Sequence, residues 1–143
     1  MKKLLALLFI VPSLAFAAKP TVTYDIEVTR VLDGDTIEYK APFLPAPLKP
    51  VLKIRVLGID TPEKGHRAQC PEEAALALKA SALTKQAVKE AKTIELQLQS
   101  WDKFGGRVLG YVLIDGKNLG DMLIAQGLAR PYDGGTKSSW CGK

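Results

Sequence analysis

The sequence has few of the side chains that bind transition metals. Its 143 residues include one histidine, His66, and two cysteines, Cys70 and Cys141. A structural zinc ion takes four ligands, so these three side chains would make an incomplete zinc site. Chemistry that depends on several histidines is disfavoured for the same reason. We expect His66 to be a solvated loop residue, with a role as a general base as the less favoured alternative.

Long apolar segments are also scarce. Residues 4–11 form an apolar run far shorter than the roughly 20 residues that span a bilayer, and no later segment approaches that length. The run follows two lysines and precedes a small-x-small motif at residues 15–17, a pattern typical of an export signal. We therefore expect residues 1–17 to be a signal peptide and the mature chain to be soluble, with a retained membrane anchor as the alternative.

The remaining segment is the size of one small domain. Removing 17 of the 143 residues would leave 126, residues 18–143, enough for a single core. That segment carries 18 basic and 15 acidic residues, a net charge of +3. The charge favours polyanionic partners only mildly, and alone it is weak evidence for them.

The two cysteines are expected to pair if the chain is exported, because an exported protein meets an oxidising compartment. A bridge between Cys70 and Cys141 would close a loop of 71 positions. The chain-entropy model then gives about 4 kcal/mol of stabilisation. Free thiols or a shared metal ion are the alternatives.

Alternating apolar residues and turn signals predict five strands. The predicted strands are 23–32, 36–39, 51–59, 93–99 and 108–114. The dipeptide D-G separates the first two as a hairpin signal, and four prolines make residues 40–50 a loop. In the fourth strand Ile94, Leu96 and Leu98 are predicted to share one face.

Two helices complete the predicted pattern. Residues 71–92 show helical apolar spacing, and Asn118 is expected to cap a short helix that ends at Gly127. The predicted order has five strands, with one helix between the third and fourth strands and another helix after the fifth. This order fits an α+β domain that is mainly β. We expect a partly open, five-stranded OB-type barrel with two or three flanking helices.

Three short motifs bring charged side chains to predicted strand ends: D-G-D-T at 33–36, R-V-L-G-I-D-T-P-E at 55–63 and D-K-F-G-G-R at 102–107. Each motif alone has a plain structural explanation as a turn, a strand end or a solvated arginine. Three of their carboxylates, Asp35, Asp60 and Glu63, together with the two arginines are the equipment for cutting a phosphodiester with a hard metal ion.

The residue types in these motifs suit that chemistry. Asp35, Asp60 and Thr61 offer oxygen ligands, which favour calcium or magnesium over zinc. Glu63 can orient or deprotonate a water molecule. The guanidinium groups of Arg55 and Arg107 can bind phosphate oxygens bidentately and stabilise transition-state charge.

With these motifs in this order, followed by A-Q-G-L-A at 125–129, the chain resembles the thermonuclease family, the staphylococcal-nuclease-like endonucleases. The resemblance covers residues 28–132. It implies an OB-type barrel, calcium, with magnesium as a weaker substitute, and hydrolysis of DNA and RNA to 3′-phosphate products. Carried over by motif, the resemblance implies that Asp35, Asp60 and the Thr61 carbonyl bind the metal ion. It implies that Glu63 activates the water and that Arg55 and Arg107 contact the phosphate.

The chain also departs from the family pattern. It has a longer proline-rich loop, an extra glycine before Arg107, and a tail too short for the usual third helix. Only Tyr132 corresponds to the family's base-stacking tyrosines, and stacking contributes about 1–3 kcal/mol per base. Lys103 is expected to attract the nucleic-acid backbone.

With the resemblance and the signal pattern together, we expect an exported monomeric endonuclease, periplasmic or, alternatively, secreted to the medium. A non-catalytic nucleic-acid-binding OB module is the first alternative function. A structural protein in which the same residues only build turns and salt bridges is the second.

Overall fold

In a computed structural model of the chain, residues 22–142 are described. The expected signal peptide, residues 1–17, lies outside this part. Within it, no helix has the length and apolar character needed to cross a membrane.

A mixed sheet forms the centre of the domain, with strand order β1-β6-β7-β4-β3-β2. The β4–β7 pair is parallel and the other pairs along this path are antiparallel. β8 adds to β7, and β5 pairs separately with β9. The strands are β1 (Thr23–Asp25), β2 (Val28–Asp33), β3 (Thr36–Lys40), β4 (Val51–Val56), β5 (Ile59–Asp60), β6 (Ile94–Trp101), β7 (Arg107–Ile114), β8 (Lys117–Asn118) and β9 (Arg130–Pro131).

Two of the predicted strands are each divided in two. The prediction of one strand over 23–32 was wrong, because the chain changes partner within it: β1 pairs with β6, whereas β2 pairs with β3. The N–H of Ile26 still donates to the carbonyl of Ile94 at 2.9 Å. The predicted strand 51–59 breaks at Gly58, whose φ of +82° turns the chain before β5.

The core lies between the sheet and the two helices. Alternate strand residues such as Ile37, Ile54 and Val112 are fully buried in it. Gly110 allows β6 to approach β7, because a Cβ there would lie 2.6 Å from the side chain of Leu96. The prediction that Leu98 shares the buried face was wrong. It is 40% exposed, next to a shift in the β6–β7 register between Leu98 and Ser100.

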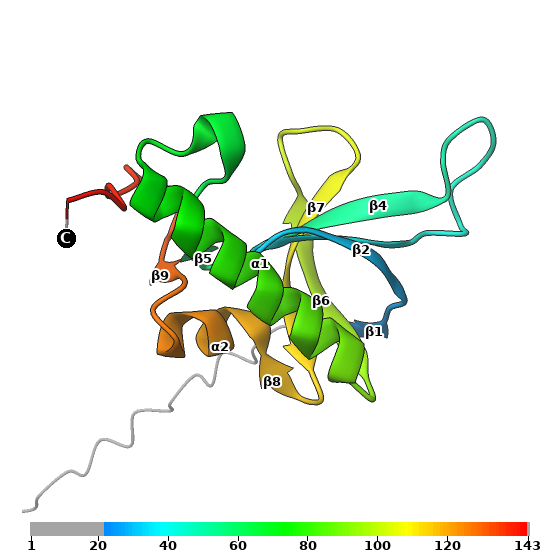
Figure 1. Cartoon of the computed structure of the whole chain (residues 1–143). Coiled ribbons are helices and arrows are strands. Elements are labelled where there is room, and N and C mark those ends of the chain that lie inside the picture. The colour runs from blue at the N-terminus through cyan, green and yellow to red at the C-terminus, as the bar shows by residue number, and fades with distance from the viewer. Residues whose placement is uncertain (1–21, 143) are drawn as a thin grey trace, which may run out of the picture.

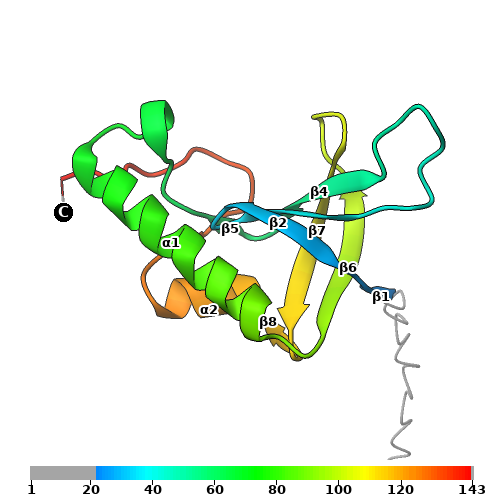
Figure 2. The ribbon, with the colours of Figure 1, turned by 45° about the vertical axis from the view of Figure 1, so that its right-hand side comes forward.

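The helices α1 (Pro71–Glu90) and α2 (Leu119–Ala125) lie on the same side of the sheet, while the 41–50 and 102–106 loops project away from them (Figures 1 and 2). As predicted, the side chain of Asn118 caps α2, accepting from the N–H of Gly120 at 2.7 Å. A short 3-10 helix, η1 (Gly65–Arg67), precedes α1. Mainly β structure with two flanking helices confirms the predicted fold class and is consistent with an OB-type fold.

Helix α1 holds the β2–β3 turn, and with it the D-G-D-T motif, in place. Thr84 donates to the carbonyl of Gly34 at 2.7 Å. A Cβ at Gly34 would lie 2.7 Å from the Cβ of Ala80, so only glycine allows this close packing. The turn is thereby fixed against the helix immediately before Asp35.

The chain after β9 returns to the N-terminal end of α1 (Figures 1 and 2). There Cys141 and Cys70, the residue before the helix, form a disulfide with a Cα–Cα distance of 6.0 Å. The expected pairing is therefore present in the structure.

Candidate active site

The predicted site residues meet around one open cleft of about 1100 Å³. Its lining includes Asp35, Arg55, Thr61, Glu63, Lys103, Arg107 and Tyr132. Asp60 is 5% exposed and lies behind this surface. Sequence positions as far apart as 35 and 132 are thus brought together by the sheet.

Strand register explains why the two arginines face one cleft. Thr36 of β3 lies opposite Arg55 of β4, and Lys53 of β4 lies opposite Arg107 of β7. Because side chains alternate along a strand, Lys53 and Arg55 point to the cleft while Ile54 points to the core.

Asp35 is buried, and each of its two carboxylate oxygens has a partner within the protein. Its Oδ2 accepts from the Thr61 hydroxyl at 2.6 Å and from the Thr61 N–H at 3.3 Å. Its Oδ1 accepts from the hydroxyl of Thr36 at 3.0 Å. Arg55 forms an ion pair with the same carboxylate. The D-G-D-T and D-T-P-E motifs therefore meet directly.

Asp60 faces three other groups. Oδ2 accepts from the indole N–H of Trp140 at 3.2 Å. Oδ1 lies 2.7 Å from the ammonium nitrogen of Lys137 and 3.9 Å from Nη2 of Arg55. One oxygen of the carboxylate is thus held by a neutral donor and the other faces cations.

Glu63 is half-buried at the edge of the cleft. Its carboxylate lies 3.3 Å from Lys137 and 3.3 Å from Nε of Arg67. Its backbone N–H donates to Oε1 of Glu73 at 3.1 Å. Both its charge and its main chain are therefore fixed by neighbours.

The two arginines have different surroundings. Burial is the main influence that lowers the pKa of Arg55, and the nearby charge of Arg107 lowers it further, whereas Asp60 and Glu63 oppose the shift. Arg107 pairs with Asp102 and lies over the ring of Phe104, 4.7 Å from its centroid. Burial alone would raise the pKa of Asp102, but the hydrogen bond and charge of Arg107 outweigh it and lower that pKa.

The structure does not gather the carboxylates of Asp35, Asp60 and Glu63 into one tight cluster. In the described part of the chain, only one group of three histidine, cysteine or acidic side chains has its possible metal-ligand atoms within 4.8 Å of one another: Cys70, Glu73 and Cys141. Both sulfur atoms of this group belong to the disulfide. Asp35 and Asp60 are nevertheless buried carboxylates, and each lies next to a positively charged side chain. They offer oxygen atoms with no histidine or thiol among them, a donor set that fits a hard cation such as calcium or magnesium.

Sequence reasoning missed several residues around the site. Lys137 and Trp140 contact Asp60, and Glu73 holds the main chain of Glu63. The position of Trp140 next to Cys141 was the one available signal, because a disulfide would fix it in space. His66 is exposed in η1 and outside the cleft lining, as expected for a loop histidine.

Comparisons with known proteins identify relatives of this chain. Residues 53–139, more than half of the chain, match the model of the family described as staphylococcal nuclease homologue. The SPbeta prophage-derived endonuclease YokF of Bacillus subtilis (strain 168) is 34% identical over 110 residues, which cover 74% of this chain and 33% of that relative. The chain thus spans about a third of the relative's length. The matched segment contains Arg55, Asp60 and Glu63, and the chain belongs to the staphylococcal nuclease homologue family.

Proposed function

We propose that this chain is an exported, metal-dependent endonuclease that hydrolyses phosphodiester bonds in DNA, RNA or both. The observation that carries the proposal is that Arg55 and Arg107, on the adjacent strands β4 and β7, line the same cleft as Asp35 and Glu63. The family and the endonuclease named in the B. subtilis relative support it.

Calcium is the metal that we propose, with magnesium as a weaker substitute. The staphylococcal nuclease family is generally metal-dependent. Asp35, Asp60 and the carbonyl of Thr61 would hold the ion, since all three offer oxygen. When bound, the ion supplies positive charge to a phosphate oxygen and fixes a water molecule.

The chain's own residues supply the remaining requirements of the reaction. The guanidinium groups of Arg55 and Arg107 bind phosphate oxygens and stabilise the charge that builds up on them. Glu63 orients the attacking water and accepts its proton. A new oxygen–phosphorus bond forms while the bond to the 5′ oxygen breaks and that oxygen takes up a proton. The products are a 3′-phosphate and a 5′-hydroxyl end.

Two cleft residues are proposed to bind the substrate beyond the scissile phosphate. Lys103 is exposed and places a positive charge at the cleft rim. Tyr132 offers an aromatic face on which a base can stack. Its hydroxyl donates to the carbonyl of Gly135 at 2.8 Å, which fixes the ring.

We propose that the protein acts as a monomer in the periplasm or, alternatively, in the medium. The disulfide between Cys70 and Cys141 supports an oxidising compartment. Fractionation of cells that express the full chain distinguishes the two destinations, and full-length protein retained in the cytoplasm would contradict export.

The activity is tested with purified protein lacking residues 1–17. Plasmid DNA and RNA are incubated with it in calcium, in magnesium and in chelator, and the new ends are labelled by a kinase that requires a 5′-hydroxyl. Calcium-dependent cutting with 5′-hydroxyl ends is expected. Binding of nucleic acid without cutting would contradict the proposal and favour a non-catalytic module.

A further inference from the structure

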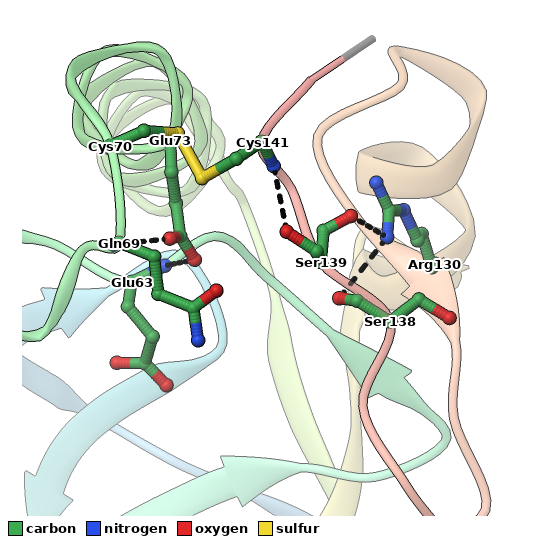
Figure 3. The surroundings of a disulfide bond; sticks show 8 residues. All are labelled: Glu63, Gln69, Cys70, Glu73, Arg130, Ser138, Ser139 and Cys141. Atoms are coloured by element: carbon green, nitrogen blue, oxygen red, sulfur yellow. Dashed lines mark hydrogen bonds between the residues drawn. A yellow bond between two sulfur atoms is a disulfide. The ribbon is translucent and has the colours of Figure 1, made fainter.

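Trp140 is the one buried residue of an otherwise exposed tail, residues 133–139 being exposed. Its ring stacks on Arg130, whose guanidinium carbon lies 3.7 Å from the ring centroid. Arg130 in turn donates to the carbonyls of Ser138 and Ser139 at 3.3 and 2.9 Å (Figure 3). The next residue, Cys141, is bonded to Cys70 (Figure 3). The indole is therefore fixed by stacking and by a covalent bond beside it.

The indole N–H selects the orientation of a carboxylate. It donates to Oδ2 of Asp60 at 3.2 Å, which leaves Oδ1 directed at Lys137 and Arg55. Rotation of the carboxylate would break this hydrogen bond, and Asp60 is only 5% exposed, so little water is available to replace it. Because indole is neutral and bonds only Oδ2, it orients Asp60 without occupying Oδ1, the oxygen that faces Lys137 and Arg55.

We propose that Trp140 is a positioning residue for the metal ligand Asp60, held in place by the Cys70–Cys141 disulfide. This inference rests on the proposed function, since it takes Asp60 as a ligand. Hydrogen bonds to a ligating group typically change metal affinity about 10- to 100-fold when they are lost. Opening the disulfide releases the tail and should weaken metal binding through the same contact.

The test is the Trp140→Phe variant, which keeps an aromatic ring over Arg130 but removes the N–H donor. Calcium binding is measured by calorimetry without nucleic acid. We expect affinity to fall about 10- to 100-fold. The calcium concentration for half-maximal cleavage should rise by the same factor. Trp101→Phe, at an exposed tryptophan outside the cleft, is the matched control and should bind calcium as the unmodified protein does.

Two further variants separate the possible failures. Asp60→Ala should lose calcium binding; if it binds normally, the proposed ligand role of Asp60 fails and this inference with it. If Asp60→Ala loses binding while Trp140→Phe binds within twofold of the unmodified protein, only the positioning role is overturned.

The double variant Cys70→Ser/Cys141→Ser leaves Trp140 intact. Assayed where circular dichroism shows it folded, it should also bind calcium more weakly, and unchanged affinity would overturn the role of the disulfide.

Discussion

Positive side chains already occupy the space between the carboxylates of the cleft. Arg55 pairs with Asp35 and approaches Asp60, and Lys137 joins Asp60 to Glu63. These contacts neutralise acidic groups that would otherwise repel one another at close range. Any metal ion that binds Asp60 must therefore do so beside the ammonium of Lys137.

Replacing Lys137 with methionine should tighten calcium binding, because it removes a positive charge 2.7 Å from Oδ1 of Asp60. Burial by itself would lower the pKa of Lys137, but hydrogen bonds and charge from Asp60 and Glu63 raise it. Since its pKa lies above the ordinary value of 10.5, the ammonium is protonated at neutral and at mildly alkaline pH. The gain in affinity should then be the same at neutral and at mildly alkaline pH.

Calorimetric titration with calcium checks this prediction. Lys40→Met is the matched control, because Lys40 pairs with Glu27 outside the cleft. Weaker calcium binding by Lys137→Met than by Lys40→Met would contradict the electrostatic argument.

The segment between β5 and α1 carries Glu63 and is held by the first turn of the helix. The buried carboxylate of Glu73 accepts from the N–H of Glu63 at 3.1 Å and from that of Gln69 at 2.7 Å (Figure 3). An acceptor with two oxygens is required for both contacts. The position of the segment that carries Glu63 therefore depends on a helix residue outside the sequence motifs.

Glu73→Gln should destabilise this segment, because one amide group would direct an NH₂ toward a backbone donor. We expect the free energy of unfolding to fall by about 1–3 kcal/mol. Cleavage should also slow, since Glu63 loses its fixed position. Chemical denaturation and cleavage rates are compared with Glu72→Gln, an exposed neighbour in the same turn. Equal stability of the two variants would contradict the capping role.

Elements with a strong local signal were predicted well from the sequence. The long helix was predicted over 71–92 and is found at Pro71–Glu90. The strand breaks near Ile26 and at Gly58 were missed, because apolar alternation does not record which neighbour a strand pairs with. Leu98 follows the alternating pattern, but a register shift that depends on the facing strand leaves it exposed.

Prediction of the site residues likewise depended on local sequence motifs. Asp35, Arg55 and Glu63 belong to compact motifs whose chemistry is readable from neighbouring residues. Lys137 and Trp140 lie in a turn-rich tail without a comparable pattern. Their contacts with Asp60 depend on the path of that tail across the molecule, which local sequence does not specify.

The disulfide joins the end of the described chain to the start of α1. Its 71-position loop contains α1, α2 and the strands from β6 to β9. Closing such a loop reduces the conformational entropy of the unfolded chain. The bond should therefore stabilise the entire domain in addition to the site.

The double variant Cys70→Ser/Cys141→Ser should lose about 4 kcal/mol of unfolding free energy in the chain-entropy model. Thermal and denaturant unfolding, each with and without reductant, measure the loss. Reductant should lower the melting temperature of the unmodified protein and leave that of the double variant unchanged. An unmodified protein whose melting temperature does not respond to reductant would contradict the bridge.

Glu63 is proposed to activate the water that hydrolyses the phosphodiester in the cleft. The most direct measurement compares the unmodified protein with Glu63→Gln, at saturating calcium, for cleavage and for binding of the same DNA. We predict equal binding and at least about 100-fold slower cleavage by the variant, since general-base catalysis contributes about 10²- to 10⁴-fold. Equal cleavage by the two proteins would contradict the proposed role of Glu63.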